Sequence, residues 1–342
     1  MSTCEYNQSP RPLPKDYPQM ETSLIISDIH GKDERLAKKL LSLAESETQP
    51  NMVVFMGDIV GTESLDKLQK LFYNGIFNPT KKLQKENPNM TDEQILSYQA
   101  ESGQTISEGI DNLLTFLNNI HPQIEPIDKA KLAREITNYT HFGHFCSNLP
   151  LEIRQYLAKD MENNARIWID IMTRFTDKGT FVTVIEGNWD ARTPLDFCPT
   201  KDKCQPLPEK ERQFSFKRLL SSLNDRVFYS QDTTTIETEN KRFILLPFDS
   251  AINNSEIPQS EEDKKDTVLL SHAQIDWSAI KGDTPMTKEG ETIQTNMRKI
   301  IEQIKPNTAA HGHLHQEPEK EYEYNGVIVH YLPKGQSRLI RF

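Results

Sequence analysis

Side chains that can bind metal ions recur in this sequence, each close behind a run of apolar residues. They are Asp28, His30, Asp58, Asn188, His272, His313 and His315. The last two belong to a cluster of three histidines within five residues, which begins at His311. Oxygen and imidazole donors are typical metal ligands, and their mixture suits transition metals better than calcium. The residue types therefore predict a metal site, provided that the fold brings them together.

The apolar runs that precede these residues are typical of buried β-strands. The five segments are SLIISDIHG from Ser23, NMVVFMGDIVG from Asn51, GTFVTVIEGNWD from Gly179, TVLLSHAQ from Thr267 and NTAAHGHLH from Asn307. Helical spacing follows the first segment and precedes the last, at residues 289–304, and such alternation predicts an α/β fold with a sheet buried on both faces. Ligands of such sheets gather at the carboxyl ends of the strands, where all these donors would lie. An Asn-Gly pair at 325–326 predicts a hairpin near the C-terminus.

The chain between Asp58 and Asn188 makes a long detour with mostly helical spacing. Turn signals interrupt it at the Asn-Pro pairs 78–79 and 87–88 and at the His-Pro pair 121–122. We expect residues 62–169 to form an inserted helical cap and residues 22–61 and 170–342 to form the core. Residues 1–21 are rich in proline and are expected to form a flexible arm.

Composition excludes several classes of protein. The net charge is -10, from 50 acidic against 40 basic side chains, so binding to nucleic acid is disfavoured. No apolar run approaches the length of about 18 residues that a membrane span needs. The first residues lack the apolar stretch of a signal peptide, and the four cysteines are ordinary for a reducing compartment. We therefore expect a cytoplasmic protein without a membrane segment.

The donor residues fall into five short motifs, which occur in order along the chain. They are Asp28-x-His30, Gly57-Asp58, Gly187-Asn188, His272 and Gly312-His313-x-His315. This set resembles the DxH, GD, GN, H and GHxH pattern of the calcineurin-like metallophosphoesterase superfamily. Any single motif is weak, whereas five in the right order, each after a predicted strand, form a specific signal. The resemblance covers residues 22–60 and 180–342, and it implies an α+β sandwich of central sheets flanked by helices.

The resemblance also implies a binuclear metal centre. Asp58 matches the bridging ligand; Asp28, His30 and His315 match the other ligands of one metal, and Asn188, His272 and His313 match those of the second. The two divalent ions could be Mn, Fe, Zn, Co or Ni. His313 and His315 alternate in an extended segment, so that each can reach a different ion, and Gly312 lets the backbone come close. His311 lies outside the pattern and is expected to be a supporting or core group.

Such a centre hydrolyses phosphate esters by attack of a metal-bound hydroxide, with Asp58, Asn188 and His313 at the reacting group. All seven ligand positions are present here, which favours an enzyme. The alternative is a non-catalytic scaffold that uses the sheets and the cap as an interaction platform. A nuclease is disfavoured because the cap carries more acids than bases. The expected partner is a small phosphate ester.

This chain departs from the family at the residues that protonate the leaving group. Many relatives have a His after the motif Asn and an Asp three residues after the bridging Asp. Here Trp189 and Gly61 occupy those positions. An indole does not release a proton at neutral pH, so good leaving groups are favoured: a phosphodiester or nucleotide-type substrate rather than an alkyl monoester.

Other residues could contact the substrate. His141 and His144 could reach the metals from the cap and supply the acid, although structural roles are the simpler expectation for both. Arg192 follows the third motif and could hold a phosphate oxygen, or it could be an ordinary surface arginine.

Overall fold

The computed structural model describes most of the chain between residues 22 and 341. The described residues are 22–31, 33–122, 129, 132, 135, 139, 141–191, 193–196, 212, 214–238, 241–248, 250, 266–281, 288–314 and 318–341. The expected N-terminal arm therefore lies outside them, as do Arg192 and His315. Among the described helices, none has the length and apolar character needed to cross a membrane.

The described strands form two sheets, and each sheet is mostly parallel. The first has the order β11-β1-β2-β3-β4, with β1 (Thr22–Ile26), β2 (Met52–Phe55), β3 (Phe181–Ile185), β4 (Val227–Ser230) and β11 (Ser337–Arg341). The second has the order β5-β6-β7-β8-β10-β9, with β5 (Thr234–Glu237), β6 (Arg242–Leu246), β7 (Thr267–Ser271), β8 (Thr308–His311), β9 (Lys320–Tyr324) and β10 (Val327–Tyr331). The antiparallel strands β11, β5 and β9 lie at sheet edges. Asn325 and Gly326, with φ of 51° and 80°, form the predicted hairpin turn between β9 and β10.

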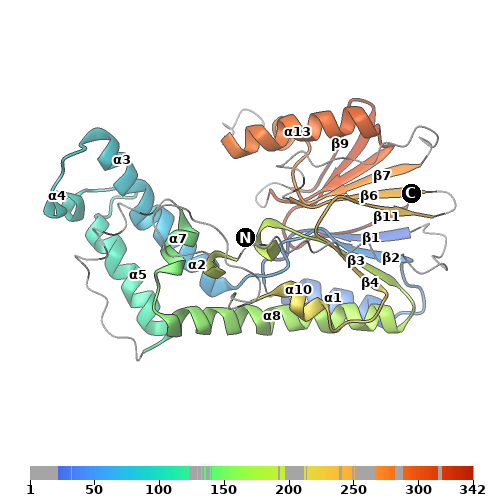
Figure 1. Ribbon diagram of the computed structural model, residues 1–342, viewed down its shortest axis with the longest axis horizontal. Helices are drawn as coiled ribbons and strands as arrows, with labels where there is room; N and C mark the ends of the chain where they lie inside the picture. Colours follow the sequence, from blue (N-terminus) through green and yellow to red (C-terminus); the bar gives the residue numbers. More distant parts are fainter. Residues whose placement is uncertain are drawn as a thin grey trace, which may run out of the picture.

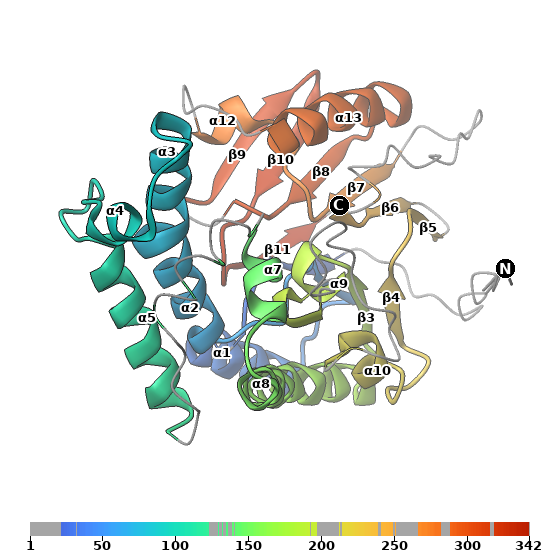
Figure 2. The same cartoon turned by 60° about the vertical axis from the view of Figure 1, so that its left-hand side comes forward.

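Helices cover the two sheets from outside and complete a four-layer α/β sandwich (Figures 1 and 2). One outer layer contains α1 (Glu34–Glu45), α8 (Leu151–Asp177) and α10 (Phe216–Leu220), and the other contains α12 (Trp277–Lys281) and α13 (Lys288–Ile304). Apolar residues of both sheets, including Val54 and Leu270, form the core between the sheets. A separate cluster joins α13 to the second sheet through Met297 and Ile300. The predicted α/β fold is confirmed.

Three strands were not foreseen from the sequence. Strands β4 and β5 are only partly buried and carry polar residues, so they lack a continuous apolar run. Strand β6 does contain such a run, at residues 243–246, and Asp249 follows it in the sequence, so the same reasoning could have found this strand.

The described part of the chain between β2 and β3 also contains six further helical segments. These are α2 (Glu63–Phe72), the π-helical η1 (Tyr73–Phe77), α3 (Asn78–Glu86), α4 (Asp92–Ser97), α5 (Ile106–Ile120) and α7 (Phe142–Ser147). They lie at one end of the sandwich, and α8 runs from them along the first sheet (Figure 1). Helix α8 is continuous across residues 169 and 170, where the sequence suggested a boundary between cap and core.

The turn expected at Asn78-Pro79 is absent, because α2, η1 and α3 follow one another without a break. A proline has no N–H and normally interrupts a helix. Here the preceding turn is a π-helix, in which the N–H of Asn78 donates to the carbonyl of Tyr73, and Pro79 stands in the first turn of α3. The first turn of a helix tolerates proline, so the chain continues in the same direction.

Candidate metal centre

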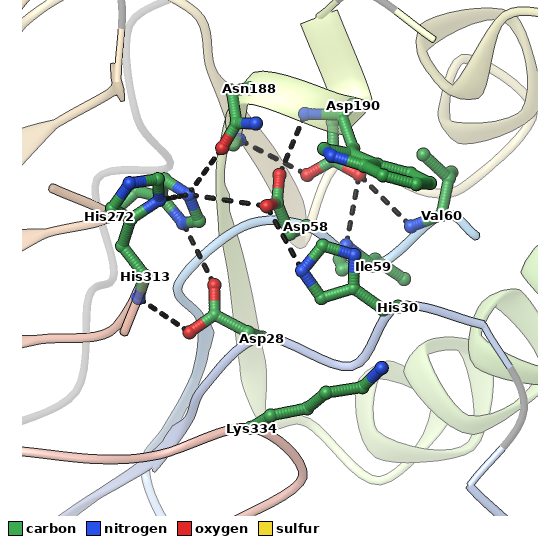
Figure 3. A network of polar contacts seen from close by, with 12 residues as sticks. Asp28, His30, Asp58, Ile59, Val60, Asn188, Asp190, His272, His313 and Lys334 are labelled. Atoms are coloured by element: carbon green, nitrogen blue, oxygen red, sulfur yellow. Dashed lines mark hydrogen bonds and ion pairs between the residues drawn. The ribbon is translucent and has the colours of Figure 1, made fainter. Parts of the chain in front are cut away.

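Six of the seven predicted donors, all except His315, come together where β1, β2, β3, β7 and β8 end (Figure 3). Three of them, His30, Asp58 and His313, have positive φ values of 49°, 49° and 71°. Such left-handed backbone is uncommon for residues with a side chain and concentrates at functional sites. The loops after β1 and β2 are also joined directly, because the N–H of His30 donates to the carbonyl of Asp58 at 2.7 Å. The ends of these strands are thus held in an unusual but well-supported conformation.

Asp58 lies at the centre of the cluster and is almost fully buried. Its Oδ2 atom lies 3.2 Å from His30 Nε2 and 3.5 Å from His272 Nε2. Its Oδ1 atom accepts a hydrogen bond from the main-chain N–H of Trp189 at 2.7 Å. Burial by itself would raise the pKa of Asp58, but the neighbouring His272 and His30 outweigh it and hold the pKa well below its usual range. The carboxylate therefore stays ionised between two imidazoles.

His272 is oriented by the carbonyl oxygen of Met56, which lies 2.7 Å from its Nδ1 atom. Its Nε2 atom then faces the cluster, 3.0 Å from Asn188 Oδ1 and 3.2 Å from His313 Nδ1. Burial lowers the pKa of His272, but the carboxylates of Asp58 and Asp28 outweigh it and raise the pKa to about 10. Metal-binding histidines usually donate their second N–H to a carbonyl or carboxylate in this way.

Asp28 is fully buried, and only one of its two oxygens is satisfied. Oδ2 accepts hydrogen bonds of 2.6 Å from Ser27 Oγ and from the main-chain N–H of His313. Within the described part of the chain, Oδ1 has no hydrogen-bond partner, although it lies 3.3 Å from His272 Nδ1. A buried carboxylate oxygen without a donor is costly unless a cation or proton compensates it.

The donor atoms form two overlapping groups, and Asp58 belongs to both. One group is Asp28, His30 and Asp58, and the other is Asp58, His272 and His313; within each, the donor atoms lie within 4.8 Å of one another. Both groups could hold a metal ion. The mixed carboxylate and imidazole donors, together with the unsatisfied oxygen of Asp28, fit divalent transition metals.

The glycines of the motifs are explained by close backbone packing. A Cβ atom at Gly57 would lie 2.7 Å from both the Cα atom of Gly187 and His272 Nδ1. A Cβ atom at Gly312 would lie 2.4 Å from Asp28 Oδ2. A side chain at either position would push the strand ends apart, so glycine is required for the donors to meet.

Asp190 is a supporting residue that sequence reasoning missed. It is buried, and its Oδ1 atom accepts from the main-chain N–H groups of Ile59 and Val60 at 3.0 and 3.1 Å. Its Oδ2 atom accepts from Gly187 N–H at 3.2 Å. Burial and, secondarily, the charge of Asp58 raise its pKa to about 7. Asp190 thus joins the loop after β2 to the loop after β3, and the carboxylate in the segment GNWD was the available signal.

Helix α8 is hydrogen-bonded to the loops that follow β1 and β2. The indole Nε1 of Trp168 donates to the carbonyl of Gly31 at 2.7 Å, and Asn164 Nδ2 donates to the carbonyl of Gly61 at 3.2 Å. Gly31 and Gly61 themselves touch, because a Cβ at Gly31 would lie 2.4 Å from the Gly61 carbonyl oxygen. The long helix therefore braces the loops that carry His30 and Asp58.

The histidines expected from the helical region lie at the start of α7. The ring of His141 caps this helix by accepting from the N–H of His144 at 3.3 Å. His144 is buried and packs edge-on against Tyr139, with ring centroids 5.1 Å apart. Burial, with the neighbouring charge of His144, lowers the pKa of His141. Helix α7 packs against η2 (Pro194–Asp196), which follows the short helix α9 (Asn188–Ala191).

The remaining predicted residues divide between the core and the undescribed part of the chain. His311 is buried, and its Nε2 atom lies 3.0 Å from the hydroxyl of Tyr322. Burial lowers its pKa to about 4, which agrees with the expected core position. The proposed ligand His315 and the proposed phosphate contact Arg192 lie outside the described residues. Phe248 was not foreseen; its ring lies 4.9 Å from that of His313 and 5.6 Å from that of His272.

Comparisons with known proteins find similarity only among solved structures. No family model matches the chain. No curated protein matches it. One similar crystal structure is 11% identical, with a TM-score of 0.38, and covers 94% of this chain and 99% of the other. The crystal structure of phosphopantetheinyl hydrolase from Mycobacterium tuberculosis is 9% identical, with a TM-score of 0.34, and covers 93% of this chain and 92% of that one.

Proposed function

We propose that this protein hydrolyses phosphate esters at the Asp/His cluster and belongs to the calcineurin-like metallophosphoesterase superfamily. The observation that carries the proposal is the pair of donor groups that share Asp58. Two ions that share a carboxylate can hold a phosphoryl group from both sides, which is the arrangement of binuclear hydrolytic sites. All the residues of these groups belong to four of the five motifs that resemble the superfamily.

The residues proposed to hold the ions follow from the two groups. Asp28, His30 and Asp58 would hold one ion with His315, and Asp58, Asn188, His272 and His313 would hold the other. Bound divalent ions supply Lewis acidity and lower the pKa of water, which makes a nucleophile available at neutral pH. The donor set suits Mn, Fe, Zn, Co or Ni and does not select among them.

The protein's own contribution is orientation. The carbonyl of Met56 fixes the ring of His272, and Ser27 together with the His313 N–H fixes the carboxylate of Asp28. We propose that Asp58, Asn188 and His313 lie at the reacting phosphoryl group. In the reaction, water loses a proton to the solvent and its oxygen forms a bond to phosphorus, while the bond to the leaving oxygen breaks and its electron pair departs with that oxygen.

We propose small phosphodiesters or nucleotide-type esters as substrates, in preference to alkyl monoesters. Position 189 carries an indole, which does not protonate the departing oxygen, so acidic leaving groups are favoured. The excess of acidic residues disfavours long nucleic acids. Residues 62–169 are proposed to act as a cap, which is supported by the start of α2 at Glu63, close behind Asp58 in the loop after β2.

Metal analysis combined with a screen of phosphate mono- and diesters tests the proposal. We expect metal-dependent turnover, and we expect Asp58→Asn to lower the metal content of both groups and to reduce turnover below detection. Arg166→Gln, an exposed change on α8, is a matched control that should retain both properties. Full turnover in metal-stripped protein would contradict the proposal. Stoichiometric metal binding without turnover of any ester would favour the non-catalytic scaffold instead.

A further inference from the structure

Trp189 occupies an unusual place beside the candidate metal centre. It stands between Asn188 and Asp190, and its main-chain N–H donates to Asp58 Oδ1 at 2.7 Å. Its indole packs edge-on against His30, with ring centroids 5.1 Å apart and an interplanar angle of 85°. The side chain is only partly buried. The indole of Trp189 therefore packs against the proposed ligand His30, while its main chain is hydrogen-bonded to the proposed ligand Asp58.

The indole N–H of Trp189 differs from that of Trp168. Trp168 is fully buried, and its Nε1 donates to the carbonyl of Gly31. Within the described residues, Trp189 forms a hydrogen bond through its main chain and none through its indole Nε1. This nitrogen is also not completely buried. The N–H of Trp189 is therefore accessible from outside and has no acceptor within the described protein.

We infer that the indole N–H of Trp189 donates a hydrogen bond to a phosphoryl or leaving-group oxygen of the bound substrate. This inference rests on the proposed function. Hydrogen bonds to charged oxygens are stronger than those between neutral groups, so the contact stabilises negative charge on the phosphate ester. The indole nitrogen is a donor only and keeps its proton, so the contact provides stabilisation without general-acid catalysis.

The backbone around Gly61 explains why an ionising pair does not fit here. Gly61 has a φ of 155°, and a Cβ atom at this position would lie 2.8 Å from the carbonyl carbon of His30. A carboxylate at position 61, which could orient a histidine at position 189, would require this loop to move. The loop is also held by Asn164 of α8. The local packing thus favours a fixed, non-ionising donor at Trp189, and with it substrates whose leaving group departs as an anion.

Inorganic phosphate serves as the probe, because it presents the same charged oxygens without requiring turnover. Phosphate binding to metal-reconstituted protein is measured by equilibrium dialysis and by tryptophan fluorescence. We expect Trp189→Phe to weaken phosphate binding about tenfold, because the ring remains but the donor to a charged oxygen is lost. Phosphate should change the emission of the wild type, and this change should disappear in the variant.

Trp277→Phe is the matched control, since it removes one of the three tryptophans from a separate hydrophobic cluster with Ile280 and Tyr331. It should retain both the affinity for phosphate and the change in emission. Equal phosphate affinity of Trp189→Phe and wild type, at equal metal content, would overturn the inference while leaving the proposed function intact. If Trp189→Phe changes the metal content, the test rests on the wild-type protein. Wild-type tryptophan emission that phosphate leaves unchanged would also overturn the inference. A wild type that neither binds metal nor hydrolyses any ester would instead overturn the proposed function.

Discussion

The Nδ1 atom of His272 lies 2.7 Å from the carbonyl oxygen of Met56, and this contact decides which ring nitrogen faces the donor cluster. Nε2 is left beside Asn188 and His313. In the metal-free protein, Asp58 and Asp28 overcome the effect of burial and raise the pKa of His272 to about 10. The ring is therefore protonated at neutral pH, and an ion that binds through Nε2 must displace that proton.

We predict that metal binding releases a proton from His272, so that the apparent affinity rises with pH up to about 10. Calorimetry in buffers of different ionisation enthalpy measures the release, and His272→Ala should reduce it by one proton per protein. The stability of the metal-free protein depends on pH in the opposite direction. Because the pKa is raised above its ordinary 6.5, the stabilisation by protonated His272 is complete below pH 6.5 and is lost as the pH rises through about 10. Metal uptake at pH 7.5 without proton release would contradict this account.

We predict that Gly61→Ala is strongly destabilising and also lowers metal affinity, because the new Cβ atom would meet the backbone of His30. Gly103→Ala is the matched control: Gly103 also has a positive φ, 82°, but nothing lies within 4 Å of its Cβ position. The control should lose roughly 1 kcal/mol through backbone conformation alone, whereas Gly61→Ala should lose several-fold more. Urea unfolding compares the two variants. Equal losses would show that the contact between these loops is not tight.

Asp190→Asn is predicted to destabilise the protein by about 1–3 kcal/mol, since the amide can replace only one of the two accepting oxygens. If Oδ1 remains opposite Ile59 and Val60, an NH2 group faces the N–H of Gly187. Metal affinity should fall about 10- to 100-fold, as for other groups that orient ligands. Denaturant unfolding and metal competition measure the two effects, with Asp225→Asn in the exposed turn before β4 as the control. An unchanged metal affinity would show that Asp190 does not support the metal site.

The dependence of rate on leaving-group pKa is predicted to be steep in the wild type, because position 189 offers no general acid. Esters of p-nitrophenol should therefore react much faster than alkyl phosphates. If His141 or His144 supplies a proton instead, the wild-type slope will be shallow, and His141→Ala or His144→Ala will steepen it. A plot of log rate against leaving-group pKa for these variants separates the two mechanisms. A shallow slope that both variants leave unchanged would exclude both.

Apolar runs that end in side chains capable of binding metal ions were sufficient to predict the α/β fold. A parallel strand that is buried on both faces is rich in apolar residues, and most residues of β1, β2, β3, β7 and β8 are buried. Partly buried strands such as β4 and β5 have no such requirement, which is why the pattern did not reveal them. The resemblance of the motifs to the metallophosphoesterase pattern implied Asp58 as the shared ligand, and Asp58 does belong to both donor groups.

Tertiary structure decided which groups orient and brace the donors. The carbonyl that fixes His272 belongs to Met56, the carboxylate that joins two loops belongs to Asp190, and the indole that holds the first loop belongs to Trp168. These contacts join residues far apart in the chain and mostly involve main-chain atoms, which every residue possesses. Residue identity therefore carries little information about them. The sequence determined which side chains could bind a metal, whereas packing between distant loops determined how each one is held.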